Sequence, residues 1–135
     1  MAQGLGNAET HSPTWRWLGL ELAEVETGAA TVLMPTRAEM ANHAGVVHGG
    51  FISLLADSAM GRSVAAAYPE GERHYSFDLK LSFIAPGRIG EGLRAVAKVL
   101  HSGRRTGVAE CRVEGEDGRL IATASASFIV YLPKE

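Results

Sequence analysis

Most of the chain alternates apolar and polar residues, which is the pattern of β-strands that bury one face. The clearest run covers residues 74–84, where Tyr75, Phe77 and Leu79 begin a series of apolar residues separated by single polar ones. Turn-forming pairs such as Pro86-Gly87 and Asp117-Gly118 interrupt the alternation. The predicted strands are residues 18–26, 29–34, 74–84, 93–100, 106–113 and 119–132.

Residues 49–66 differ from the rest, because they contain no proline and carry apolar residues at helical spacing. These apolar residues cover more than one stripe of a helix, so we expect a central helix that is largely enclosed. The order is two strands, one helix and then four strands, whose short links predict an antiparallel meander. The predicted fold class is α+β, with one sheet covering one long helix.

Length and composition fit one domain, since 135 residues can bury a core without disulfides. We assign residues 1–14 to a loose polar arm and residues 15–135 to the domain. Cys111 is the only cysteine, and its place in an alternating run predicts a buried strand residue. The net charge of -2 gives no basic surface for nucleic acid. No signal peptide or membrane-spanning run of roughly 18 apolar residues is evident, so a cytoplasmic protein is expected.

The stretch from Asn42 to Arg62 carries the candidate chemistry. His48, Gly49 and Gly50 stand at the start of the predicted helix, and one carboxylate, Asp57, follows two turns later. Glycines let a substrate approach the helix N-terminus, where free N–H groups and the helix dipole favour a developing negative charge. A buried carboxylate costs free energy unless it is paired, so the presence of Asp57 within an apolar helical run requires an explanation. Together these features indicate acyl-transfer chemistry.

The element order, with NHAGVVHGG leading into LLADSAMG, resembles the hotdog-fold thioesterases of the phenylacetate-pathway (PaaI-type) and 4-hydroxybenzoyl-CoA thioesterase-like family. The resemblance covers residues 15–132. It implies a five- to six-stranded antiparallel sheet wrapped around the helix. It also implies hydrolysis of acyl-CoA thioesters without metal or cofactor, by homodimers or by homotetramers built as dimers of dimers.

The resemblance also assigns roles to particular residues. Asp57 matches the catalytic carboxylate, and Gly49 matches the backbone N–H that polarises the thioester carbonyl, with His48 shaping the turn. Asn42 matches a side chain that orients the water or the carbonyl, and Ser76 matches a hydroxyl that holds the water. The residues expected to bind the substrate are Gly50 and, at the CoA phosphates, Arg88, Arg104 and Arg105.

Spacing constrains this assignment. Eight residues separate Gly49 from Asp57, about 12 Å along a helix, so one carbonyl cannot contact both. The geometry works if a second chain supplies the carboxylate across a two-fold axis. Ser76 raises a different problem, because strict alternation places it on the face opposite Tyr75 and Phe77. Asp57 could act as general base or as direct nucleophile, and the sequence leaves both open.

Plainer interpretations stand beside these. His48 fits a helix cap better than a direct catalyst, and no acid or cysteine near His43 and His48 has ligand spacing, so no metal is expected. Asn42 could be a turn residue, and Arg104-Arg105 a solvated hairpin tip. The alternatives at the level of function are a non-catalytic acyl-CoA sensor and a hotdog dehydratase or hydratase acting on β-hydroxyacyl thioesters. The acyl group, aromatic or a longer chain, is not determined, with a preference for an aromatic one.

Overall fold

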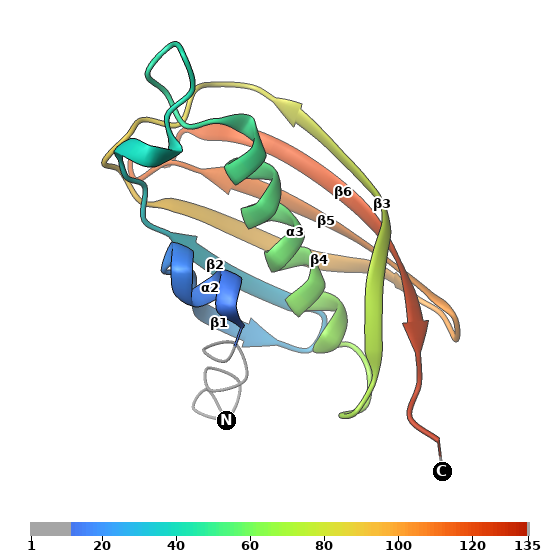
Figure 1. Cartoon of the computed structure of the whole chain (residues 1–135). Helices are drawn as coiled ribbons and strands as arrows, with labels where there is room; N and C mark the ends of the chain where they lie inside the picture. Colours follow the sequence, from blue (N-terminus) through green and yellow to red (C-terminus); the bar gives the residue numbers. More distant parts are fainter. Residues whose placement is uncertain (1–11, 135) are drawn as a thin grey trace.

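The computed structural model describes residues 12–134. Six antiparallel strands form one curved sheet in the order β1-β2-β4-β5-β6-β3, and helix α3 lies across its concave face (Figure 1). This arrangement confirms the predicted α+β class. The elements are α2 (Pro13–Leu18), β1 (Glu21–Glu26), β2 (Ala29–Met34), η1 (Ala38–Met40), α3 (Gly49–Ala65), β3 (Arg73–Phe83), β4 (Leu93–Ser102), β5 (Thr106–Glu114) and β6 (Leu120–Tyr131).

Helix α3 begins and ends within one residue of the predicted bounds. One stripe of the helix is buried against the sheet, and it includes Leu55, Ala59 and Met60, each with no exposed surface. The opposite stripe, with Asp57, Ser58 and neighbouring residues, is only partly covered. No residue of α3 from 51 to 65 is exposed, so the helix is largely enclosed as expected, with one stripe fully buried by the sheet and the other partly covered.

The N-terminal part of the described chain contains a second α-helix that the sequence pattern did not predict. Ser12 caps α2 by accepting a hydrogen bond from Trp15 N–H, Pro13 occupies its first turn, and Gly19 ends it with φ of 73°. Strand β1 consequently starts at Glu21 and not at residue 18. The predicted loose arm, residues 1–14, lies mostly outside the described residues, and its last residues belong to α2.

The predicted four-strand meander is wrong at its first strand. Strands β4, β5 and β6 pair in sequence order, but β3 pairs with β6 at the edge of the sheet. The connection of residues 84–92 therefore crosses the end of the sheet to reach β4. Ile84 and Ala85 donate their N–H groups to Ile121 O, and Val47 donates to Gly87 O. This connection lies beside the start of α3 as a result.

Strand β3 contains a β-bulge between Ser76 and Asp78, which leaves Phe77 without a partner in the pairing register. Ser76 pairs with Phe128 and Leu79 pairs with Ala126, and both partners are buried on the concave face. Since paired residues of an antiparallel sheet share a face, Ser76 and Leu79 also share one. The strict alternation expected for residues 74–84 is thus wrong, and Ser76 faces the helix.

Three further observations concern the described residues 12–134. Cys111 is buried in β5, as its alternation predicted, and burial raises the pKa of its thiol to about 12. Among these residues, no helix is both long and apolar enough to cross a membrane. They also contain no group of three or more His, Cys, Asp or Glu side chains arranged to hold a metal ion.

Candidate active site

The start of α3 is held in place by backbone hydrogen bonds. His48 N–H donates to Met40 O at 2.8 Å, and His48 then serves as the N-cap residue, with its Nδ1 accepting from Gly50 N–H at 2.8 Å. The expected capping role of His48 is confirmed. No residue of the described chain accepts a hydrogen bond from Gly49 N–H. That N–H is therefore available to an acceptor from outside the chain.

Gly49 and Gly50 are not required for an unusual backbone conformation, because neither has a positive φ. They are required for space. A Cβ at Gly49 would lie 3.0 Å from Cζ of Phe83, and a Cβ at Gly50 would lie 3.0 Å from Nδ1 of His48. The first glycine admits the Phe83 ring, and the second admits the ring that caps its own N–H.

Asn42 organises the loop that precedes the helix. Its Oδ1 accepts hydrogen bonds from Ala44 N–H at 2.9 Å and Val46 N–H at 3.3 Å, and its own N–H donates to Val46 O. This is the turn-capping arrangement given above as the plainer interpretation. It does not use the side-chain NH₂ group of Asn42, whose two hydrogens are donors of the kind that could orient a carbonyl.

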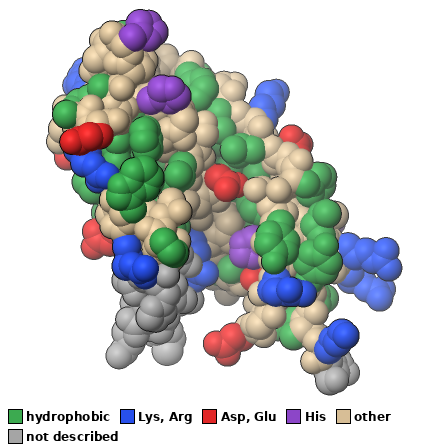
Figure 2. Space-filling view, in the orientation of Figure 1, with side chains coloured by type: hydrophobic (Ala, Val, Ile, Leu, Met, Phe, Trp, Pro, Cys, Tyr) green, Lys and Arg blue, Asp and Glu red, His purple; other side chains and the backbone are tan. Residues whose placement is uncertain are grey.

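Asp57 lines a hollow of about 410 Å³ between α3 and the edge of the sheet. Ser76 lines the same hollow, close enough for its hydroxyl group to lower the pKa of the Asp57 carboxyl group. Seen from the helix side, this face of the molecule gathers hydrophobic side chains along β3 (Figure 2). The residues lining the hollow are Trp15, Asp57, Ser58, Gly61, Arg62, His74, Tyr75, Ser76 and Phe128.

The electrostatic setting of Asp57 is mixed. Burial raises the pKa of its carboxyl group, while the hydrogen bond from Ser76 and the charge of His74 lower it, and the net result is a raised pKa. Its Oδ1 is buried and has no hydrogen-bond partner among the described residues. A buried carboxylate oxygen without a partner is costly, and such groups concentrate at functional sites.

The predicted site residues form three groups within one chain. Asn42, His48, Gly49, Gly50 and Arg88 lie around the start of α3, since Val46 pairs with Arg88. Asp57 and Ser76 lie together near the middle of the helix. Arg104 and Arg105 lie in the β4–β5 turn, where Tyr68 O–H, beyond the other end of α3, donates to Gly103 O at 2.6 Å.

Sequence reasoning missed two residues of the hollow, His74 and Trp15, and a third residue that contacts His74. His74 stands two positions before Ser76 and faces the helix with it. Because side chains two positions apart in a strand share a face, the assignment of Ser76 to the site could have pointed to His74 as well. Glu72 contacts His74 and is almost completely buried. Trp15 reaches the hollow from α2, and no local sequence pattern indicated that placement.

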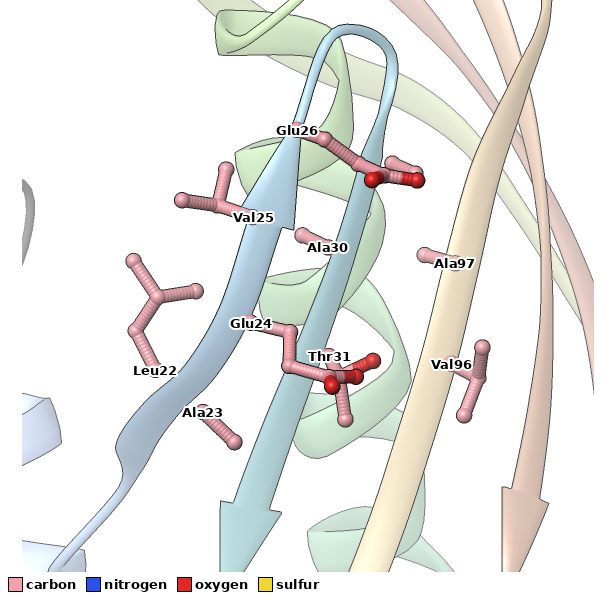
Figure 3. A pocket seen from close by; sticks show the side chains of 10 residues that line it. Leu22, Ala23, Glu24, Val25, Glu26, Ala30, Thr31, Val96 and Ala97 are labelled. Carbon is pink, nitrogen blue, oxygen red and sulfur yellow. The ribbon is translucent and has the colours of Figure 1, made fainter. Parts of the chain in front are cut away.

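A larger hollow on β1, β2 and β4 does not compete with this site. Figure 3 shows Glu24 beside Thr31, and Glu26 nearer the turn of the β1–β2 hairpin, and none of the predicted site residues lines this hollow. Glu24 instead lies 3.9 Å from Arg94, an exposed ion pair. The lining contains neither a histidine nor a helix N-terminus, so it offers no arrangement for acyl transfer.

A sheet curved around one long helix is the hotdog fold, and a carboxylate on the open side of that helix is typical of the thioester hydrolases built on it. Residues 44–122 match the thioesterase superfamily, and the chain belongs to this family of thioester hydrolases. The matched segment runs from the loop before α3 into β6, so it includes the whole of the helix and the bulged strand.

Individual relatives agree with the family. The chain is 30% identical to the acyl-coenzyme A thioesterase PaaI of Escherichia coli over 105 residues, 78% of this chain and 73% of the relative. It is 29% identical to the medium/long-chain acyl-CoA thioesterase YigI of Salmonella typhimurium, over 89% of this chain and 86% of the relative. The solved structure of E. coli PaaI, from the phenylacetic acid degradation operon, superposes with a TM-score of 0.87 at 25% identity, covering 94% of this chain and 90% of that one.

Proposed function

We propose that the protein hydrolyses acyl-CoA thioesters, with Asp57 as the catalytic carboxylate. The observation that carries the proposal is the buried, unpartnered Oδ1 of Asp57 in an open hollow, in a chain whose helix also presents a free N–H at Gly49. PaaI and YigI, both named as acyl-CoA thioesterases, support the substrate class. The sensor and dehydratase alternatives have no comparable support.

The proposed reaction needs a donor group that polarises the thioester carbonyl and a carboxylate that acts as base or nucleophile. Gly49 N–H polarises the thioester carbonyl, the Asn42 NH₂ group orients the carbonyl or the water, and His48 keeps the helix start in place as its cap. Asp57 either removes a proton from an attacking water held by Ser76, or attacks the carbonyl to give an anhydride that water opens. In both courses the C–S bond breaks and CoA leaves as a thiolate. In the first course the water oxygen enters the acid, and in the second it enters either the acid or the Asp57 carboxylate, depending on which anhydride carbonyl the water attacks.

We assign the complete site to two chains. Gly49 and Asp57 are about 12 Å apart along one helix, so a single carbonyl requires Gly49 from one subunit and Asp57 from another. Strand β3 supports an interface here, because it is an edge strand with a row of exposed apolar side chains. Its exposed apolar residues include Tyr75, which lines the Asp57 hollow, and Phe77, Leu79 and Phe83. A homodimer, alone or paired into a tetramer, follows from this proposal.

The two groups of arginines differ as candidates for the CoA phosphates. Arg88 lies 3.7 Å from Asp117, close to Glu91 and Glu116, so its surroundings are acidic. Arg104 and Arg105 instead line a hollow with further cations and no acid, and Lys and Arg side chains gather at this end of the molecule (Figure 2). The cations of that hollow are Arg73, Arg104, Arg105 and Lys134. We favour it as the phosphate site and Arg88 as a structural residue.

The hollow beside Asp57 also bears on the acyl group. Trp15, Tyr75 and Phe128 supply aromatic walls, which favour a flat apolar group such as an aryl-acetyl chain. YigI is named as a medium/long-chain acyl-CoA thioesterase, so longer acyl chains are also included in the test. A panel of phenylacetyl-, benzoyl-, hexanoyl- and palmitoyl-CoA separates the two classes by kcat/KM.

The decisive experiment follows released thiol from that panel with wild type, Asp57→Ala and Asp78→Ala. Asp78 is the matched control, because it is an exposed aspartate outside the hollow. We expect Asp57→Ala to lose about 100-fold or more in turnover, roughly 2.7 kcal/mol of barrier, and Asp78→Ala to keep its activity. Tight acyl-CoA binding with no turnover by wild type would contradict the proposal in favour of a sensor.

A further inference from the structure

Beside the hollow, in contact with one of its lining residues, lies a buried acid that the proposed reaction does not use. Glu72, in the turn before β3, has a side chain only 7% exposed, and both of its carboxylate oxygens lie 3.1 Å from Nδ1 of His74. A carboxylate can only accept, so Nδ1 must carry a hydrogen. Glu72 thereby fixes which nitrogen of the ring is protonated and how the ring is oriented.

The other ring nitrogen of His74 lies against the Asp57 side of helix α3. A Cβ at Gly61 would lie 3.3 Å from His74 Nε2, and Gly61 is one helical turn beyond Asp57 on the same face. The ring also stands edge-on to Phe128 at a centroid distance of 5.6 Å. Glu72, Gly61 and Phe128 therefore enclose the imidazole on three sides and leave its Nε2 edge towards the hollow.

The charged and titratable groups around His74 can be named for each element packed on it. Helix α3 contributes Asp57 and Arg62, the preceding turn contributes Glu72, and Tyr68 lies close enough to Glu72 to be affected by its charge. Strand β6 contributes only the apolar Phe128 and Val130, and α2 contributes Trp15. Within this set, His74 is the group whose charge acts favourably on the Asp57 carboxylate.

We propose that Glu72 and His74 are positioning residues for Asp57: Glu72 accepts the hydrogen bond that orients the His74 ring, and the imidazolium form of His74 keeps the neighbouring carboxylate ionised in a hollow that would otherwise favour its neutral form. This inference rests on the proposed role of Asp57 as catalytic carboxylate. It gives the buried Glu72 a purpose, and it explains why position 61 lacks a side chain. It also means that the reaction is sustained at lower pH than burial alone would allow, because the ionised form is the one that attacks or accepts a proton.

The test measures the titration of the Asp57 carboxyl carbon by NMR in the full-length protein, beside the pH profile of kcat/KM. Three variants perturb His74 differently: His74→Gln removes the charge, Glu72→Ala removes the orienting acid, and Gly61→Ala pushes the ring from the helix. We expect the Asp57 midpoint and the acidic limb of the profile to move to higher pH in all three. His101→Gln, which removes an exposed histidine of β4, is the control and should leave both unchanged.

Gly61→Ala guards against a purely structural explanation. Alanine favours a helix interior over glycine by about 1 kcal/mol, so a shifted midpoint there cannot come from a weakened helix. A folded His74→Gln protein with a wild-type Asp57 midpoint overturns the proposal, and a wild-type midpoint in folded Glu72→Ala overturns the part assigned to Glu72. The NMR titration does not require turnover, so it remains decisive if the protein proves not to hydrolyse acyl-CoA.

Discussion

The ring of Phe83 lies against the backbone of Gly49, so closely that a methyl group at residue 49 would meet Cζ of Phe83 at 3.0 Å. The contact joins the last residue of β3 to the first residue of α3, across 34 positions of the sequence. It aligns the free N–H at the helix start with the edge strand that carries Ser76.

The Phe83–Gly49 contact predicts a compensating pair of substitutions. Gly49→Ala forces the Phe83 ring away and should cost roughly 1–3 kcal/mol of stability, the usual range for overpacking. In a Phe83→Ala background the same change should cost much less, because the obstacle is gone. Urea denaturation of the four proteins measures the coupling. Additive effects of the two substitutions would show that the ring is not what excludes a side chain at residue 49.

The helix cap predicts a second difference. His48→Ala removes the acceptor for Gly50 N–H and should lower the free energy of unfolding by about 1 kcal/mol. His48→Asn keeps an acceptor and should recover most of that loss. Thermal or urea denaturation gives the comparison, and activity should follow it, since His48 is proposed to act through the helix start. Loss of activity in His48→Asn with full stability would instead indicate a direct part in the reaction.

The shared site predicts complementation between inactive chains. Gly49→Pro removes the proposed polarising N–H at a position where a helix accepts proline, and Asp57→Asn removes the carboxylate. Each homodimer should be inactive, whereas a heterodimer has one intact site from the two unaltered halves. Random mixing should restore about a quarter of wild-type activity, because half of the dimers are mixed and each has one of two sites. No recovery in heterodimers verified by mass spectrometry would place the whole site within one chain.

The raised pKa of Asp57 has opposite consequences for activity and stability. Activity should fall on the acidic side at a higher pH than an ordinary aspartate would give, and Ser76→Ala should move that limb further up by removing a hydrogen bond to the ionised form. Because the folded state binds the Asp57 proton more tightly than the unfolded state, this group favours folding least when it is ionised. Asp57→Asn should therefore be inactive yet more stable than wild type at neutral pH. Equal denaturation midpoints would contradict the inference that the buried, ionised carboxylate destabilises the folded protein.

Local patterns were sufficient for most of the fold. The bounds of α3 and of β2, β4 and β5 follow from hydrophobic periodicity and turn residues, which act over a few positions. The position of β3 in the sheet does not follow from local patterns, because its place at the edge beside β6 depends on pairing between residues about 50 apart in sequence. Helix α2 was missed because six residues are too few to show a helical period, although Ser12, Pro13 and Gly19 are the usual start and stop signals.

The candidate site was predictable where it depends on one segment. The cap at His48 and the free N–H at Gly49 both follow from the start of a helix. Ser76 was assigned to the polar face because a bulge leaves no clear mark in the sequence of β3. His74 and Glu72 become significant only when the strand is folded over the helix. In physical terms, residues whose environment comes from distant strands could not be recognised from their own neighbours.

The bulge at Phe77 is a single extra residue, and in genetic terms it corresponds to one codon. Unbroken pairing of β3 with that residue retained would turn either His74 and Ser76, or Leu79 and Leu81, away from the helix. The bulge thus lets the two halves of this strand, one with a chemical demand and one with a packing demand, face the helix together. Removing the codon would keep both halves on that face, because Ser76 would then be followed by Asp78 and Leu79 in their present pairing with Ser127 and Ala126. An alignment with related genes that lack this codon must therefore place the gap at Phe77, since a gap outside the strand would put the serine and the histidine on the wrong side of the protein.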